Sequence, residues 1–146
     1  MKEFFNIEDV AMITGLSTRT IRHYIADGFL EGDKSTGAWQ FTADQLDVFL
    51  QKEVIKPAVR AKRNAIVYDF LGSKPQTQGK ICVVLDLPSS HEMETMMFFC
   101  KYISELEPDA ELRFASDKLG KGLRVILSGS DKDVMELLNQ YYKSQS

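Results

Sequence analysis

The chain is poor in cysteine and histidine, with two of each among its 146 residues. Two cysteines cannot form the disulfide framework of a small secreted domain, and this inventory argues against a structural zinc site. No stretch approaches the roughly 18 consecutive apolar residues of a membrane span, and the first residues lack the apolar core of a secretory signal. We therefore expect a cytoplasmic protein without a membrane contact or a metal site.

The motifs of nucleotide-dependent enzymes are missing as well. The sequence contains neither G-x-x-x-x-G-K-[ST] nor G-x-G-x-x-G, the loops that hold phosphates in many such enzymes. No serine or cysteine stands in a pattern with a histidine and an acid, although a nucleophile needs an oriented base. We expect no catalytic residue, no cofactor and no enzymatic activity.

Positive charge is concentrated locally, although the chain as a whole carries a net charge of −3. Between Lys52 and Arg63 five basic residues stand against the single acid Glu53. A shorter run from Arg19 to His23 holds two arginines and a histidine with no acid. Such runs are typical of a surface that meets phosphate, although a solvated helix face gives the same pattern.

A segment without apolar residues divides the chain. Residues 72–79 are rich in turn formers and are interpreted as a linker. We predict one domain at 1–71 and a second at 80–146. The predicted fold class is α+β, with an N-terminal winged helix-turn-helix domain followed by a small β-α-β-β-α domain.

The first half has the signals of helices in close succession. Asn6 can cap a first helix that Gly15 ends, because a left-handed position after a helix favours glycine. Ser17 or Thr18 can cap a second helix that ends at Gly28, so that about three residues separate the two, as in a helix-turn-helix. The other predicted elements are a polar-tipped hairpin over 29–41, a helix after a capping box at Thr42 and a helix from Pro57.

The second half mixes strand and helix signals. Apolar strands are predicted over 80–87, 110–114 and 123–127, with one helix after the first strand and another after the last. The last two strands should pair antiparallel across a turn at 117–122. Both helices should then cover one face of a three-stranded sheet.

The other face of this predicted sheet would be bare. Cys82, Val84 and Ile126 would form a partly apolar surface there, which is a candidate for self-association or for another partner. A domain of about 67 residues is also near the lower limit for a self-sufficient core. We therefore expect the second half to hold the dimer contact.

The second helix carries side chains with which proteins read DNA. A recognition helix needs a polar and basic exposed face that a scaffold holds rigid. Arg19 and Arg22 project from one face, and a guanidinium can hold a guanine edge or a phosphate in a bidentate way. We expect the helix 17–27 in the major groove. The candidate DNA-binding residues are Ser17, Thr18, Arg19, Thr20, Arg22, His23, Lys34, Arg60, Lys62 and Arg63.

The run from Ile7 to Leu30 resembles the start of MerR-type transcriptional regulators, and the resemblance extends over residues 5–50. Its best-matching positions are Gly15, Ser17, Thr20, Arg22, Tyr24, Gly28 and Leu30. The resemblance implies a winged helix-turn-helix fold and DNA binding as a dimer. It also implies that the second helix enters the major groove and that Arg22 touches the phosphate backbone or base edges.

The hairpin departs from the MerR pattern R-x-x-x-G-Y-R-x-Y. Aligned on Gly37, the chain has Asp33, Ala38, Trp39 and Phe41 where that pattern has Arg, Tyr, Arg and Tyr. In this respect it is more similar to excisionase-type relatives. Trp39 and Phe41 are then expected in the core of the hairpin, and Lys34 is the cation left to touch phosphate.

Two functions of different classes follow from these patterns. The first is a sequence-specific DNA-binding transcriptional regulator whose partners are double-stranded DNA and a second copy of the chain, with a small-molecule effector as a further candidate ligand. The alternative is a protein-interaction adaptor that uses the winged-helix fold, with a small-molecule-sensing C-terminal domain. The recognition-helix arginines favour DNA, and the missing arginines of the hairpin favour the adaptor.

Overall fold

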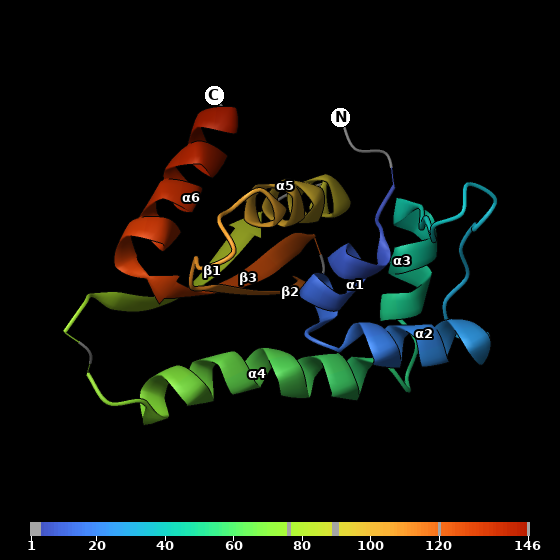
Figure 1. The fold of residues 1–146 in the computed structure, drawn as a ribbon, viewed down its shortest axis with the longest axis horizontal. Helices are drawn as coiled ribbons and strands as arrows, with labels where there is room; N and C mark the ends of the chain where they lie inside the picture. Colours follow the sequence, from blue (N-terminus) through green and yellow to red (C-terminus); the bar gives the residue numbers. More distant parts are fainter. Residues whose placement is uncertain (1–3, 76, 89–90, 120, 146) are drawn as a thin grey trace. The chain divides into compact units, whose positions relative to one another are not determined.

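The computed structural model describes residues 4–75, 77–88, 91–119 and 121–145 (Figure 1). The chain divides into two compact units, Met1–Lys62 and Arg63–Ser146, and each is described by itself. Residue 76 of the predicted linker lies outside the described residues. Within the described ranges, no helix combines the length and the apolar content needed to cross a membrane.

The first unit contains α1 (Ile7–Thr14), α2 (Thr18–Ala26), α3 (Ala43–Leu50) and the start of α4 (Lys56–Gly72). The predicted caps are confirmed: Asn6 and Thr42 each form a capping box, and the Ser17 side chain accepts from the N–H of Thr20. These bonds satisfy N–H groups that have no partner within the first turn of a helix. The caps therefore determine where each of the three helices begins.

The hairpin closes through a single residue pair. Asp33 and Gln40 exchange two backbone hydrogen bonds of 2.9 and 2.8 Å, and residues 34–39 form the loop between them. A second bridge, which the sequence did not predict, joins Phe5 to Phe41 through two bonds of 2.8 Å. Both phenylalanines are fully buried, so this bridge ties the N-terminal segment into the core of the first unit.

The second unit contains the end of α4, β1 (Lys80–Pro88), α5 (Glu92–Ser104), β2 (Leu112–Leu119), β3 (Gly122–Ser130) and α6 (Asp131–Ser144). The strands form one sheet in the order β1-β3-β2, with β3 antiparallel to both neighbours. The elements follow in the predicted order, and the last two strands pair antiparallel as predicted. Their turn is shorter than the predicted 117–122, because Asp117 and Lys118 belong to the ladder and face Arg124 and Leu123.

Helices α5 and α6 pack on one face of this sheet. Phe99 of α5 stacks on Phe114 of β2 and on Tyr141 of α6, with ring centroids 5.5 and 5.3 Å apart. All three rings are buried. Cys100, next to Phe99, is buried as well, as expected for a small hydrophobic side chain. Burial of these large rings is a main source of stability for so small a unit.

The other face of the sheet is not bare, which corrects the expectation from the sequence. The end of α4 covers it, with Ile66 buried in one cluster with Ala115 of β2 and Ile126 of β3. Cys82 of β1 packs against the same cluster. Of the three residues expected at a bare surface, Ile126 is buried, Cys82 is half-buried and Val84 alone stays exposed.

Two ion pairs hold the same part of α4 near β2. Arg113 donates to Asp69 at 2.9 Å, and Arg63 contacts Asp117. Both pairs join residues more than 40 positions apart in the sequence. With the Ile66 contact they assign residues 63–72 to the second unit, so the boundary between the two compact units lies within α4.

We predict that Ile66→Ala destabilises the second unit. Removing a buried isoleucine side chain beyond Cβ costs about 2–5 kcal/mol, and here it would open the contact with Ala115 and Ile126. Urea unfolding of the full chain, followed by circular dichroism, measures the loss. The control is Asn64→Ala, an exposed position of the same helix, which should change the free energy of unfolding by about 0.5 kcal/mol or less. Equal effects of the two variants would contradict the packing of α4 on the sheet.

Candidate nucleic-acid interface

A tight turn fixes the direction of α2 relative to α1. Gly15 is left-handed (φ 75°), and its N–H donates to the Ala11 carbonyl at 2.8 Å, so α1 ends where predicted. The Thr14 hydroxyl donates to the Val10 carbonyl at 2.8 Å and accepts from the Leu16 N–H at 3.1 Å. These bonds pair the polar groups that the turn buries, and such pairing is required wherever water is excluded.

Gly15 also touches the start of α4. A Cβ atom built on Gly15 would lie 2.8 Å from the Cβ atom of Lys62, closer than real Cβ contacts. The stem of Lys62 therefore packs on the turn, while Lys62 as a whole stays exposed. This close approach is a second reason, besides the backbone conformation, for a residue without a side chain at position 15.

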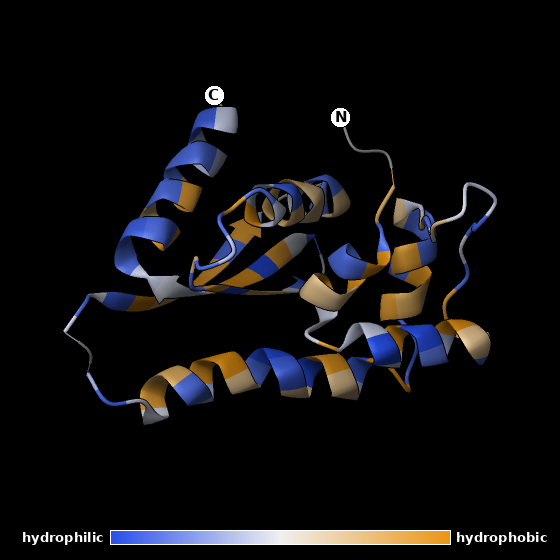
Figure 2. Ribbon diagram, in the orientation of Figure 1, coloured by the Kyte–Doolittle hydropathy of each residue, from blue (hydrophilic) through white to orange (hydrophobic). Residues whose placement is uncertain are grey.

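Helix α2, along which hydrophilic and hydrophobic residues both occur (Figure 2), turns Ile21 inward and its basic residues outward. Ile21 is fully buried, whereas Arg19, Arg22 and His23 are exposed. Exposed basic residues on a helix of fixed direction are what contact with a DNA groove requires.

The hydroxyl residues of α2 have a structural task at the helix start. Ser17 Oγ accepts from the Thr20 N–H at 3.1 Å and lies 3.0 Å from Thr20 Oγ1. Thr18 is half-buried. Ser17 therefore caps the helix, and any contact of Ser17 or Thr20 with DNA would have to use the remaining capacity of these hydroxyls.

The hairpin loop, residues 34–39, has an ordered tip. The Asp33 carboxylate accepts from the Ser35 N–H at 2.8 Å and from the Ser35 hydroxyl at 3.0 Å. These bonds, the backbone one first, lower the pKa of the Asp33 carboxyl below its ordinary value. Gly37 is left-handed (φ 94°), and its N–H donates to the Lys34 carbonyl at 3.0 Å. The loop thus presents Lys34 from a closed turn.

Lys34 and Trp39 form a pair that sequence reasoning missed. The Lys34 ammonium lies 5.7 Å from the centre of the indole ring, in cation–π range. The indole also stacks on Phe41, with ring planes 8° apart. Trp39 is therefore only partly a core residue, because it also positions a cation. The sequence predicted the hairpin but not its closing pair. With Asp33 paired to Gln40, positions 34 and 39 follow as neighbours on the two sides of the loop.

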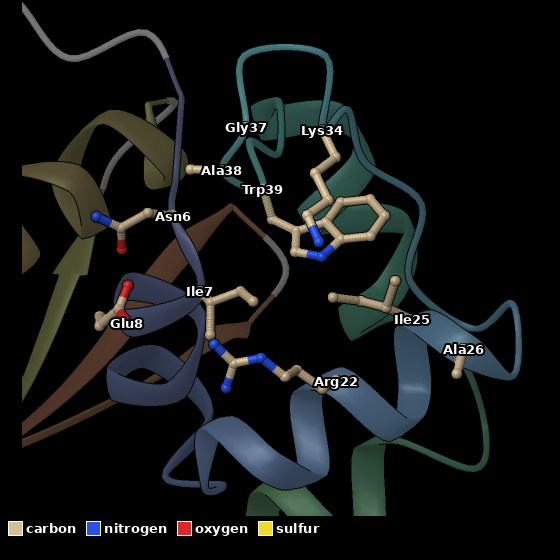
Figure 3. Close-up of a pocket in the computed structure, with 10 residues that line it drawn as sticks. All are labelled: Asn6, Ile7, Glu8, Arg22, Ile25, Ala26, Lys34, Gly37, Ala38 and Trp39. Carbon is tan, nitrogen blue, oxygen red and sulfur yellow. The ribbon is translucent and has the colours of Figure 1, made fainter.

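A hollow of about 480 Å³ lies between α2 and the hairpin loop (Figure 3). Its lining includes Arg22 and Ile25 of α2, Lys34 and Trp39 of the loop, and Glu8 of α1. Figure 3 shows the Arg22 side chain pointing from α2 toward the start of α1 and the Lys34 ammonium beside the indole. Two cations and one carboxylate border this opening, so its positive charge suits an anionic backbone.

The six arginines of the chain fall into two groups of three. Those of the second unit are all paired with aspartates, as Arg63–Asp117, Arg113–Asp69 and Arg124–Asp86. Within the described chain, Arg19, Arg22 and Arg60 make no ion pair, and all three are exposed. Arg63 was a predicted DNA contact, but only 11% of its side chain is exposed. The structure thus gives Arg63 a role in the second unit and leaves Arg60 and Lys62 at the surface.

Residues 5–51 match the family model described as MerR HTH family regulatory protein. This part of the chain is a helix-turn-helix of the MerR type. The matched segment holds α1, α2, the hairpin loop and α3, and the match indicates a DNA-binding regulator. No curated protein and no solved structure matches the chain.

We predict that Gly15→Ala destabilises the first unit more than Gly28→Ala does. Both glycines are left-handed, which costs a residue with a side chain about 1–2 kcal/mol. A Cβ on Gly28 meets nothing within 4 Å, whereas a Cβ on Gly15 meets Lys62. Urea unfolding followed by the fluorescence of Trp39, the single tryptophan, measures both losses. Equal losses would mean that the contact with Lys62 is unimportant.

Proposed function

We propose that the protein is a sequence-specific DNA-binding transcriptional regulator that inserts α2 into the major groove. The observation that carries the proposal is that Arg19 and Arg22 are exposed and have no ion pair with any described residue, on a helix held by a bonded turn. Because these arginines are in no ion pair with a described residue, they can form bidentate hydrogen bonds with guanine without the free-energy cost of breaking such a pair. His23, exposed on the same helix, is a further candidate contact.

The hairpin loop supplies the wing in this proposal. Arg22 and Lys34 border one hollow from opposite elements, so a phosphate group at its mouth could contact both. The indole beneath Lys34 restricts the ammonium and offers an apolar surface to a sugar. MerR-type wings carry arginines that this wing lacks. Lys34, held over the Trp39 indole, takes their place as the cation of the wing.

Arg60 and Lys62 are proposed to extend the phosphate contacts. Both are exposed, and both belong to the first unit. The stem of Lys62 lies on the turn between α1 and α2, and the residue as a whole is exposed, so its ammonium can reach a backbone that lies along α2. Contacts with phosphate strengthen binding to any sequence and do not select among sequences.

A homodimer is part of the proposal. One helix-turn-helix reads a short half-site, and two-fold dimers read two such sites about one helical turn apart. The second unit is the proposed site of dimerisation, and a small-molecule effector of this unit would act by changing the spacing of the two recognition helices.

The adaptor is the second candidate function. The observation that favours it is the exposure of Val48 and Val54 in the first unit, where a hollow between α3 and the segment that follows α2 is lined by Phe29, Val48 and Lys52. Apolar residues at a surface are typical of protein contacts. This region does not include Arg19 or Arg22, so the two functions predict different sensitive residues.

We predict that Arg22→Ala abolishes specific DNA binding without unfolding the chain. Loss of a bidentate base contact should weaken binding by about 1–3 kcal/mol. A gel shift against fragments selected by the wild-type protein measures the change. Arg113→Ala is the control, because it removes the same charge from the second unit. Unchanged affinity of Arg22→Ala would contradict the docking of α2, and a loss of partner binding on changing Val48 would favour the adaptor.

We also predict that the double variant Arg60→Gln, Lys62→Gln lowers the salt dependence of binding. Each lost phosphate contact reduces the slope of log affinity against log salt by about 0.9, so the slope should fall by about 1.8. Arg63→Gln is the comparison, because its partner is Asp117, and it should leave the slope unchanged. A double variant with the wild-type slope would show that these two cations face only water.

A further inference from the structure

The β1 edge of the sheet is apolar and poorly covered. Strand β2, at the opposite edge, has three consecutive buried residues, 114–116. In β1 none of the residues 80–86 is buried, although the central sequence is Ile-Cys-Val-Val-Leu. Within the described residues β1 pairs with β3 alone. An unpaired edge strand that is long and apolar pairs readily with another strand, and proteins normally protect it with charge, proline or cover.

One flank of α6 carries the exposed apolar residues Met135 and Tyr142 and lies on the same side of the sheet as β1. Helix α6 contacts α5, and Phe98 of α5 lies against Tyr141 of α6 with ring centroids 5.6 Å apart. Burial and then the charges of Glu136 and Asp133 raise the pKa of Tyr102 on α5, in agreement with a place for these two residues on the α5 side of α6. Helical geometry puts Met135 and Tyr142 on the opposite flank. Because α5 packs on β2 and α6 on β3 and β1, this second flank faces outward past β1.

The end of α4 repeats this arrangement on the other face of the sheet. Asp69 reaches Arg113 on β2, so its flank of α4 faces the β2 edge. Leu71 lies on the opposite flank by helical spacing, toward β1, whereas Tyr68 lies nearly opposite Ile66 and points away from the sheet. Four large exposed apolar residues of the second unit are therefore on the β1 side: Leu71 72%, Val84 52%, Met135 48% and Tyr142 53%.

From this distribution we infer that β1 pairs with β1 of a second copy of the chain, so that two sheets join into one of six strands. The inference deepens the proposed function, because it rests on the homodimer and names its contact. The flanks of α4 and α6 would pack against their counterparts above and below the joined strands. This would bury Leu71, Val84, Met135 and Tyr142 around one two-fold axis.

The sequence of β1 is complementary to itself in this pairing. A two-fold axis perpendicular to the sheet makes the strands antiparallel and keeps each residue on its own face. With Val83 on the axis, Ile81 faces Leu85 of the second copy, and Lys80 faces Asp86 of the second copy. Lys80 already pairs with Glu111 and Asp86 with Arg124 within one copy, so the contact would give each of them a second partner of opposite charge. This complementarity favours a second copy of the chain over an unrelated partner.

The first test is the mass of the full chain in solution. Sedimentation at concentrations on the order of 10 μM should give a dimer for the wild-type protein and a monomer for Val84→Lys, Met135→Lys. Both positions are exposed, so the charges disturb the contact and not the fold. Val48→Lys, an equally exposed position in the first unit, is the matched control and should remain a dimer. A monomeric wild-type protein, or a dimeric double variant, would overturn the inference.

The second test does not depend on weakening the dimer. With Val83 on the axis, position 84 faces Cys82 of the second copy, so Val84→Cys should form a disulfide between copies on mild oxidation. The covalent dimer should disappear on reduction and in Val84→Cys, Cys82→Ser. If Val84→Cys gives no covalent dimer while the chain sediments as a dimer, the contact lies elsewhere and the inference is overturned.

The two tests separate this inference from the proposed function. Binding of DNA that depends on Arg22 would stand even if the wild-type chain were monomeric, and then only the β1 contact would fail. If the β1 contact is present but no DNA is bound, the proposed function fails alone. In the monomeric double variant, affinity for a two-half-site DNA should fall at least about tenfold, since each copy then binds without its neighbour.

Discussion

Gly15 stands where α1 must stop and α2 must begin within three residues, and the position has no room for a side chain. Its left-handed backbone ends α1, the Thr14 hydroxyl pairs the polar groups of the turn, and the stem of Lys62 closes it from α4. The direction of α2 depends on this turn. The positions of Arg19 and Arg22 depend on this turn as well. The hollow that Arg22 borders together with the hairpin loop therefore also depends on it. A change at the turn would therefore disturb the candidate interface without touching any of its charged groups.

Pairing, and not overall charge, separates the surfaces of the two units. The net charge of −3 gives no sign of a nucleic-acid partner. Arg63 and Arg60 are three residues apart in α4, yet one is tied to Asp117 and the other is exposed. An ion pair holds a guanidinium in place and neutralises it, which suits a packing role. An unpaired, exposed guanidinium keeps its full attraction for phosphate, and in the described chain such arginines lie in the first unit.

Local signals were enough to predict the ends of the first helices and the order of the elements. Caps and a left-handed glycine act within three or four residues, so Asn6, Ser17, Thr42 and Gly15 could be placed from the sequence. Contacts between distant residues could not. Neither the burial of Ile66 on the sheet nor the Phe5–Phe41 bridge has a local pattern. The Lys34–Trp39 pair is an intermediate case: it has no local pattern of its own, but it follows from the hairpin once the closing pair Asp33–Gln40 is known.

The central claim is that two copies of α2 read DNA as a symmetric pair. Selection of random duplex DNA by the full-length protein, followed by sequencing of the bound fraction, tests it most directly. A symmetric pair should enrich an inverted repeat whose half-site centres lie about 10–10.5 base pairs, or a multiple of this, apart. Enrichment of a single unrepeated motif would contradict the symmetric pair, and no enrichment at all would contradict sequence-specific reading by α2.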